Sequence, residues 1–398
     1  MSYFYDSNVQ AHGRAVGHHA LAHPAAVAQT QAVQIVHGGP DARGAAQYDF
    51  STNSNACGPC PHALAAVQQA DATRYPDPAY TALRARLAQF HGVEAARIVL
   101  AASASECIHR ITALAAQQGA RAVALPAHSY GDYAQAAQAR GLRLLRPHDT
   151  GWHGASLHWA CAPSSPLGGA DPALQAWRDG PPLQEVPGPL RVLDCAYAPL
   201  RLHGDSTSAS TNAHTSSNAN DSSSSNATAG CLLPVRAFDL PDVDPSAWQL
   251  WTPNKALGLT GVRAAYAVAP PGTDAAVAAL TALAPSWPVG AHGLALLESW
   301  ITPASQRWLA GCLAVLRDWK AQQQALCTEL GWTVWPASQA NYFCARLDVP
   351  DVQSRLRQLR GHGVQLRDCT SFGLPGVVRV GVLPPPAQAA LRRAWRGQ

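Results

Sequence analysis

The sequence predicts an α/β fold: a three-layer large domain built on a mostly parallel sheet, followed by a smaller α+β domain. Short apolar segments alternate with Ala- and Leu-rich helical segments over residues 97–268, and strands without polar alternation are typical of sheets covered on both faces. Hydrophobic residues make up 47% of the 398 residues and charged ones 14%, so a large core can form. From about Trp287 a long helical stretch precedes short strands, which indicates the second domain.

The same patterns predict the individual elements. In the large domain we expect strands and helices in alternation, with strands at 97–101, 122–125, 157–160, 190–193 and 263–268, and helices at 80–92, 106–118, 133–141 and 172–179. In the smaller domain we expect a helical stretch over 292–330, strands at 333–335, 342–347 and 377–382, and a helix at 352–363.

Two segments of biased composition bound and interrupt these elements. Residues 1–35 are rich in Ala and His without periodicity, which predicts a mobile leader. Residues 204–230 are almost wholly Ser, Asn, Thr and Ala, and cannot bury enough apolar surface to offset their ordering entropy. We therefore expect a large domain over 36–285 that carries 204–230 as a disordered insertion, and a small C-terminal domain over 286–398.

Composition also excludes several classes of protein. The net charge is only +4, and no basic run is interleaved with aromatic residues, so nucleic-acid binding is not expected. No apolar stretch reaches 18 residues, which excludes a membrane span. The N-terminus lacks the apolar region of a signal peptide, which predicts a cytoplasmic protein whose ten cysteines are mostly reduced. The histidines near the N-terminus lack regular ligand spacing, so no metal site is predicted.

The segment Cys57-Gly-Pro-Cys60 has the spacing of a thioredoxin-type redox pair. Such a pair acts where the first cysteine opens a helix directly after a strand, because the helix N-terminus lowers the pKa of its thiol. Here the segment lies in a polar loop that leads to a helix. We therefore expect two ordinary loop cysteines.

The strongest candidate site surrounds Lys255, one of only two lysines in the chain. Thr252 lies three residues before it and Arg263 eight residues after it, with small, flexible residues in between. A lysine in this setting can form a Schiff base, while the hydroxyl and the guanidinium can hold a phosphate. The second lysine, Lys320, lies in a polar helical stretch, where we expect a solvated side chain.

Two strand ends supply further candidate residues. Asp194 ends a buried strand, where ligand sites of α/β proteins lie, and its carboxylate can pair with a protonated pyridine nitrogen. The segment 103–105 ends another strand and opens a helix, so its free backbone N–H groups can bind an anion. Each feature alone has an ordinary structural explanation, but their order and spacing together favour a site for pyridoxal 5′-phosphate (PLP).

In this order of motifs the chain resembles the fold-type I PLP enzymes of the aspartate aminotransferase superfamily, over roughly residues 35–398. The resemblance implies that PLP is the cofactor, that Lys255 forms its Schiff base, and that Asp194 pairs with the pyridinium nitrogen. It implies further cofactor contacts from Tyr197 at the 3′-oxygen, from Tyr130 by stacking, and from Ala104, Ser105, Thr252 and Arg263 at the phosphate. It also implies that Arg379 binds the substrate α-carboxylate. Tyr75 would reach the cofactor phosphate of a neighbouring subunit, which implies a homodimer with shared active sites.

Two branches of that superfamily are similar to this chain: histidinol-phosphate aminotransferase and the threonine-phosphate decarboxylase of cobalamin synthesis. His37-Gly-Gly and the segments 49–59, 285–289, 340–342 and 367–376 resemble the decarboxylase more closely, which makes decarboxylation of a small phosphorylated amino acid our preferred prediction. The aminotransferase is the alternative. In either case the candidates for substrate binding are His37, Asn53, Asn341 and Arg367.

Several positions depart from the family pattern. Ser165 stands in the turn Ala162-Pro-Ser-Ser-Pro-Leu-Gly168 where the family has an asparagine that contacts the cofactor, and Cys195 and Asn254 replace a usual glutamate and serine. A serine reaches less far than an asparagine and would need a bridging water or a shifted backbone. These departures motivate a third hypothesis, an impaired PLP-binding homologue. The choice between decarboxylation and transamination depends on the orientation of the substrate carboxylate, which the sequence does not specify.

Overall fold

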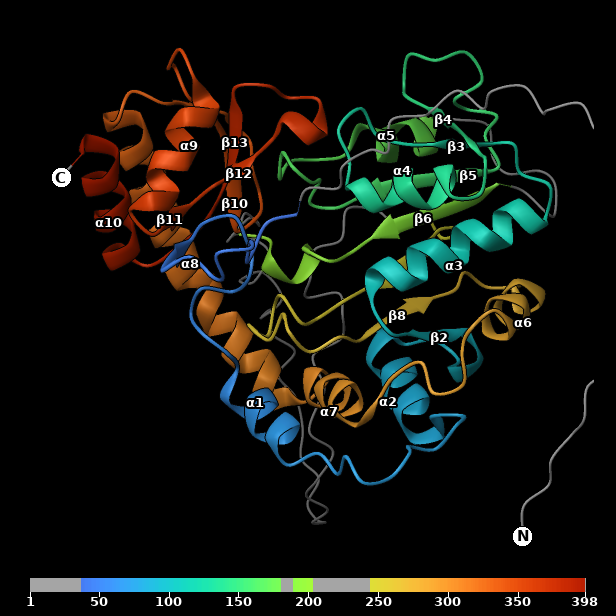
Figure 1. The fold of residues 1–398 in the computed structure, drawn as a ribbon. Coiled ribbons are helices and arrows are strands. Elements are labelled where there is room, and N and C mark those ends of the chain that lie inside the picture. The colour runs from blue at the N-terminus through green and yellow to red at the C-terminus, as the bar shows by residue number, and fades with distance from the viewer. Residues whose placement is uncertain (1–36, 180–188, 203–243, 398) are drawn as a thin grey trace, which may run out of the picture. The chain divides into compact units, whose positions relative to one another are not determined.

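The computed structural model describes residues 37–179, 189–202 and 244–397 (Figure 1). The predicted leader and the Ser/Asn-rich insertion lie outside the described residues. The expected α/β class, with a large and mostly parallel sheet, is confirmed. In the described part of the chain, no helix is both long enough and apolar enough to cross a membrane.

The larger sheet contains seven strands among the described residues, in the order β2-β8-β7-β6-β5-β3-β4. Their bounds are β2 (Ile98–Ala101), β3 (Ala122–Ala124), β4 (Arg143–Leu145), β5 (Leu157–Cys161), β6 (Leu190–Asp194), β7 (Trp248–Trp251) and β8 (Ala265–Val268). Strand β8 runs antiparallel to both of its neighbours, and the other pairs are parallel. In the register of the central strands, Asp194 lies between Cys161 and Leu250, so the carboxyl ends of β5, β6 and β7 share one edge.

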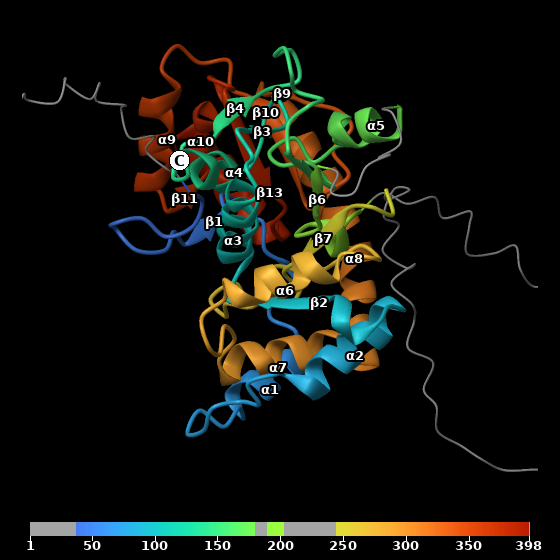
Figure 2. The same ribbon diagram turned by 90° about the vertical axis from the view of Figure 1, so that its right-hand side faces the viewer.

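Helices cover both faces of this sheet, as the uninterrupted apolar strands predict. One face packs against α3 (Ala104–Gln117), α4 (Gly131–Gln138) and α6 (Asp274–Ala282). The other packs against α1 (Pro61–Gln68), α2 (Thr81–His91), α5 (Pro172–Asp179) and α7 (Ala291–Trp300). Figure 2 shows β2 between α6 on one side and the α1–α2–α7 group on the other. Adjacent residues of β2 alternate between the two cores, Val99 facing the first and Leu100 the second.

A smaller antiparallel sheet, with the order β12-β13-β10-β9 among the described residues, forms near the C-terminus. It consists of β12 (Arg367–Asp368), β13 (Val377–Gly381), β10 (Tyr342–Arg346) and β9 (Thr333–Val334). Three helices belong to the same part of the chain: α8 (Pro303–Glu329), α9 (Val352–Gly361) and α10 (Pro385–Arg396). Strand β1 (Tyr48–Asp49) pairs with β11 (Val364–Gln365), and Gly381 N donates to the carbonyl oxygen of Phe50 at 2.7 Å. The segment after β1 is thereby attached to the C-terminal sheet.

The predicted helical stretch over 292–330 is two helices rather than one. Helix α7 ends at Trp300, and α8 starts after Thr302, whose hydroxyl accepts a hydrogen bond from Ser305 N at 3.3 Å. Pro303 follows at the first helical position, where its missing N–H costs nothing. The elements that the sequence patterns did not indicate are β4, β7, α6, α10 and the short strands β1, β11 and β12.

Candidate active site

Asp194 occupies the middle of the carboxyl edge of the large sheet and is only 4% exposed. Its Oδ2 accepts a hydrogen bond of 2.6 Å from the Tyr133 hydroxyl, and its Oδ1 accepts one of 2.9 Å from Ala196 N. Burial raises the pKa of Asp194, while these hydrogen bonds and the nearby charge of Lys255 act in the opposite direction. A carboxylate can accept more bonds than these, so Asp194 can take another, cationic donor.

Tyr133 is a site residue that the sequence analysis missed. It is fully buried on α4, and its ring stacks on that of Trp159 with centroids 4.6 Å apart and planes 8° from parallel. The stacking fixes the direction of the hydroxyl toward Asp194. The sequence offered one indication of its role: Tyr133 follows the candidate residue Tyr130 by three positions, so the two side chains share a helical face. Only the tertiary structure shows that this face is turned toward Asp194.

Lys255 lies in the loop after β7, and its backbone is held firmly. Its carbonyl oxygen accepts hydrogen bonds from Asn55 N at 2.9 Å and from Gly258 N at 3.2 Å. The half-buried side chain places Nζ 5.3 Å from the centroid of the Tyr197 ring. Its positive charge lowers the pKa of Asp194, which places the amine within electrostatic reach of that carboxylate.

Tyr197, Asn53 and Arg379 form a connected polar group beside Lys255. The Asn53 amide lies 3.4 Å from the Tyr197 hydroxyl. With its oxygen turned toward Arg379, the same amide accepts hydrogen bonds of 3.1 Å from Nε and 3.3 Å from Nη1. Tyr342 packs edge-on against Tyr197 at 4.8 Å and lies under the Arg379 guanidinium at 5.3 Å. The structure thus brings residues from distant parts of the chain together with Asp194 and Lys255.

Arg379 and Arg367 are buried cross-strand neighbours, 7% and 5% exposed. Arg379 donates to Ser165 Oγ at 3.2 Å and to the carbonyl oxygen of Ser51 at 3.3 Å. None of the described carboxylates forms an ion pair with Arg379. A buried guanidinium held by neutral groups alone favours an anionic ligand.

Arg367 faces the same space from β12. It donates to the carbonyl oxygen of Asp368 at 2.7 Å and to Ser371 Oγ at 2.8 Å. The Phe372 ring lies 4.8 Å from the Arg367 guanidinium carbon and 5.8 Å from that of Arg379. Burial and, secondarily, the charge of Arg379 lower the pKa of Arg367, so an anion between the two guanidinium groups would relieve their repulsion.

The candidate phosphate-binding residues meet where β2, β8 and β7 lie side by side. Ala101, at the end of β2, pairs with Ala265, at the start of β8, so the segments 102–105 and 263–264 share one edge. The Thr252 hydroxyl donates to Asn254 Oδ1 at 3.0 Å and to the carbonyl oxygen of Ala264 at 3.3 Å. Arg263 is exposed and makes no hydrogen bond or ion pair with another described residue. The N-terminus of α3 therefore lies beside a free guanidinium, a suitable arrangement for an anion.

The first turn of α3 carries the other two candidates. Ser103 caps the helix, its Oγ accepting from Glu106 N at 3.1 Å, and Ala104 and Ser105 follow. Ser105 Oγ lies 3.4 Å from the Tyr130 hydroxyl, and burial raises the pKa of Tyr130. The His37 ring lies 6.0 Å from that of Tyr130, with Nε2 3.9 Å from Asp132 Oδ1. His37, Ser105 and Tyr130 thus lie in one neighbourhood.

Two candidates occupy different surroundings. Tyr75 is 77% exposed, and its ring stacks on that of Trp287 with centroids 4.4 Å apart. Asn341 is fully buried, and its Nδ2 donates to the carbonyl oxygens of Asn53 at 3.3 Å and Ser54 at 3.1 Å. Asn341 therefore holds the segment that carries Asn53.

The prediction that Lys320 is solvated is wrong. Its side chain is only 2% exposed, and Nζ donates to the carbonyl oxygens of Ser338 at 2.6 Å and Ala340 at 2.8 Å. The polar sequence of α8 does not reveal that this turn faces inward, onto the loop before β10. Burial lowers the pKa of Lys320 to about 8. Of the two lysines, Lys255 is the one beside Asp194.

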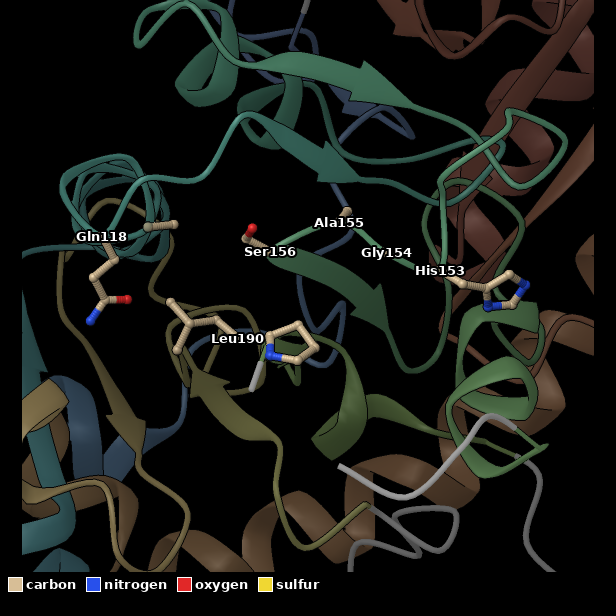
Figure 3. Close-up of a pocket in the computed structure, with 8 residues that line it drawn as sticks. Gln118, His153, Gly154, Ala155, Ser156 and Leu190 are labelled. Atoms are coloured by element: carbon tan, nitrogen blue, oxygen red, sulfur yellow. The ribbon is translucent and has the colours of Figure 1, made fainter. Parts of the chain in front are cut away.

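A separate pocket of about 320 Å³ lies at the opposite edge of the sheet. Figure 3 shows four of the residues that line this pocket: Ser156 and Leu190, at the amino ends of β5 and β6, and Gln118 and His153. Because ligand sites of such sheets lie at the carboxyl edge, the group around Asp194 is the better candidate.

Comparison with known sequences agrees with this geometry. The family described as aminotransferase class I and II matches residues 45–162 and 236–396. The chain belongs to this family. Among its relatives, histidinol-phosphate aminotransferase 1 of Thiobacillus denitrificans is 26% identical over 356 residues, which cover 84% of this chain and 80% of that protein.

Solved structures of aminotransferase-family proteins have the same fold. One is histidinol-phosphate aminotransferase of Sinorhizobium meliloti in complex with PLP, with a TM-score of 0.65, 20% identity, and coverage of 94% of this chain and 99% of that one. Another is L-threonine-O-3-phosphate decarboxylase of Porphyromonas gingivalis, with a TM-score of 0.64, 18% identity, and coverage of 87% and 98%. These structures show the shared fold, and the family match confirms the resemblance to fold-type I PLP enzymes: the chain is a PLP-dependent enzyme.

The residues of the site fit this cofactor. The buried carboxylate of Asp194 suits the protonated ring nitrogen of the cofactor. Nζ of Lys255 lies close enough to Asp194 to lower the pKa of that carboxylate. The free guanidinium of Arg263 beside the N-terminus of α3 suits the phosphate.

Proposed function

We propose that this aminotransferase-family enzyme decarboxylates a small amino acid that carries a phosphate, most like threonine phosphate. The observation that carries the proposal is the pair of buried arginines, Arg379 and Arg367, directly opposite each other on β13 and β12. Side chains at such positions start about 5 Å apart. Two cations so close together suit a short substrate with an anion at each end.

The α-carboxylate is assigned to Arg379 and the substrate phosphate to Arg367. Arg379 lies beside Asn53 and Tyr197, next to Lys255, where the reacting carbon must lie. Arg367 lies opposite Arg379 on the neighbouring strand β12, with its guanidinium carbon 4.8 Å from the Phe372 ring. His37 is the second proposed phosphate ligand, and Asn341 positions Asn53 through the backbone. This assignment gives each substrate anion a bidentate donor.

PLP, when bound, supplies an electron sink that stabilises negative charge on the substrate carbon. The roles proposed for the residues of the chain follow from their contacts. Asp194 holds the ring nitrogen protonated, and Tyr133 orients Asp194. Lys255 attaches the cofactor covalently and moves the proton at the substrate carbon. Arg379 sets the orientation of the carboxylate, and with it whether the carboxylate or the proton leaves.

The remaining cofactor contacts are proposed from position. Tyr130 and Tyr197 flank the site, and Ala104, Ser105, Thr252 and Arg263 surround the place of the cofactor phosphate. Ser165 Oγ accepts a hydrogen bond from Arg379, and its hydroxyl hydrogen can still be donated toward the cofactor. Ser165 is therefore kept among the proposed cofactor contacts and also helps to position the carboxylate-binding arginine.

A homodimer is proposed from the exposed aromatic pair of Tyr75 and Trp287. These side chains stack on each other at the surface, where a second subunit can cover them, and Tyr75 would then reach the partner's cofactor phosphate. The division into domains over 36–285 and 286–398 and the cytoplasmic location are retained as part of this proposal.

Transamination of histidinol phosphate is the second candidate, favoured by the curated relatives at 26% identity. One experiment separates the two: purified enzyme with PLP is given threonine phosphate alone, or histidinol phosphate with 2-oxoglutarate. Release of CO₂ with an amino-alcohol phosphate supports decarboxylation. Formation of glutamate supports transamination. A cofactor absorption band that shifts with neither substrate nor any other amino acid would favour the impaired homologue.

A further inference from the structure

The loop Cys57–Cys60 places its two cysteines in different surroundings. Cys60 is buried, with Sγ 3.6 Å from Ser305 Oγ. Cys57 is partly exposed, and its Sγ lies 3.9 Å from the carbonyl oxygen of Cys312 on α8. The two thiol groups are also close enough for each to shift the pKa of the other. The structure therefore pairs Cys57 with a cysteine far away in the sequence, and not with Cys60.

The two thiols of this pair differ in acidity. Hydrogen bonds from Cys57 and Asn55 lower the pKa of Cys312 to about 7, against the opposing effect of burial. Hydrogen bonding to Cys312, together with burial, raises the pKa of Cys57. At neutral pH a large fraction of Cys312 is therefore ionised while Cys57 stays protonated, and the thiolate is the form that reacts with oxidants.

The same loop is bonded directly to the segment that carries Lys255. Asn55 donates from its backbone N to the carbonyl oxygen of Lys255 at 2.9 Å and from Nδ2 to that of Ala256 at 3.0 Å. Cys60 N donates to the carbonyl oxygen of Leu257 at 2.8 Å. A Cβ at Gly258 would lie only 2.5 Å from the carbonyl oxygen of Gly58. The two segments are so closely packed that a shift of one displaces the other.

We propose that Cys57 and Cys312 form an oxidisable site at which a peroxide installs a disulfide that displaces the Lys255 segment. The Cys312 thiolate attacks one peroxide oxygen, the O–O bond breaks, and a sulfenic acid and hydroxide form. The Cys57 sulfur then attacks the sulfenic sulfur, and its proton leaves with the hydroxyl group as water. In total, two thiols and one hydrogen peroxide give one disulfide and two water molecules.

Formation of the disulfide requires the sulfurs to approach to about 2.05 Å, well inside hydrogen-bond distance. Cys57 must therefore move together with Asn55, whose Oδ1 accepts from Cys57 N at 3.0 Å. A displacement of about 1 Å near reacting groups can cost roughly 100-fold in rate, so we expect oxidation to lower turnover at least ~10-fold. This effect on turnover rests on the proposed function of Lys255, whereas formation of the disulfide does not.

The test treats the holoenzyme with hydrogen peroxide, alkylates the remaining thiols and maps disulfides by peptide mass spectrometry. We expect a Cys57–Cys312 disulfide that dithiothreitol reverses and that is absent from Cys57→Ser and Cys312→Ser. Cys60→Ser is the matched control and should oxidise like the wild type. A Cys57–Cys60 disulfide, or no disulfide at Cys312, would overturn the proposal.

Visible absorption of the lysine-bound cofactor and turnover are measured on the same samples before and after oxidation. A Cys57–Cys312 disulfide that changes neither would overturn the coupling to Lys255. If the reduced enzyme turns over neither test substrate, the proposed function fails, but the peptide map and the cofactor spectrum still decide the inference about the thiols.

Discussion

The Tyr133 hydroxyl donates a hydrogen bond of 2.6 Å to Oδ2 of Asp194, and both side chains are buried. Burial alone would favour the neutral acid, which cannot keep the cofactor ring nitrogen protonated. Tyr133 opposes that effect, because its hydrogen bond stabilises the ionised carboxylate. The Trp159 ring, stacked on Tyr133, holds the hydroxyl in position. An aromatic pair in the core thus supports the charge on which the cofactor depends.

We predict that Tyr133→Phe raises the pKa of Asp194 further and shifts the acid limb of the kcat/KM–pH profile upward. A hydrogen bond to a charged group contributes about 1.5–3 kcal/mol, equivalent to a shift of roughly 1–2 pH units. The loss of activity should be largest at low pH, where more of Asp194 would be protonated. Tyr130→Phe is the control, since that hydroxyl lies beside Ser105. An acid limb that stays in place in Tyr133→Phe would show that Asp194 does not depend on Tyr133.

The sequence was sufficient for the α/β class and for most strands and helices of the large sheet, because buried strands and Ala-rich helices leave clear patterns. It also indicated Asp194 and Lys255, since a strand-end acid and a lysine in a flexible loop are local features. Contacts between distant segments left no such pattern. The hydrogen bond between Tyr133 and Asp194 and the contact between Cys57 and Cys312 both arise from the register of the sheet and the packing of α8.

A labelling experiment should show which of the two lysines, Lys255 or Lys320, binds the cofactor. Borohydride reduction of the holoenzyme, followed by peptide mass spectrometry, should find the cofactor on Lys255. The attachment should vanish in Lys255→Ala and persist in Lys320→Met. Cofactor attached to Lys320 would contradict the assignment.

Lys320→Met should instead destabilise the protein. The substitution leaves the buried carbonyl oxygens of Ser338 and Ala340 without their donor, at a cost of about 1–3 kcal/mol for each unsatisfied group. Thermal or urea unfolding should show the loss. Lys255→Met, at a half-buried position whose side chain donates no hydrogen bond to a described residue, is the matched control. Equal stability of the wild type and Lys320→Met would mean that water replaces the lysine.

Deleting residues 205–229 should leave cofactor binding and kcat nearly unchanged. The segment is composed almost wholly of Ser, Asn, Thr and Ala, with too few apolar residues to form a core of its own. Shortening a loop changes its closure entropy only slowly with length. Cofactor titration and steady-state kinetics of the deletion variant check the expectation. A large rise in KM would instead show that the segment takes part in substrate binding.

The last prediction separates the two substrate anions. Arg379 contacts Asn53 and Ser165 near Lys255, so Arg379→Ala should weaken every amino-acid substrate, phosphorylated or not. Arg367→Ala should weaken phosphorylated substrates alone. A charged hydrogen bond to a desolvated anion contributes about 1.5–3 kcal/mol, or roughly 10- to 100-fold in kcat/KM.

The measurement is kcat/KM for a phosphorylated amino acid and its unphosphorylated counterpart in both variants. The preference for the phosphorylated substrate should shrink in Arg367→Ala and stay nearly constant in Arg379→Ala, because only the first variant removes a partner of the phosphate. Arg379→Lys and Arg367→Lys keep the positive charge but lose the paired N–H donors of the guanidinium group. Each should therefore recover part of the kcat/KM that the corresponding alanine variant loses. Equal losses on the two substrates in Arg367→Ala would mean that the second buried arginine supports Phe372 and the β12–β13 pairing rather than a phosphate, and a phosphorylated substrate would no longer be expected.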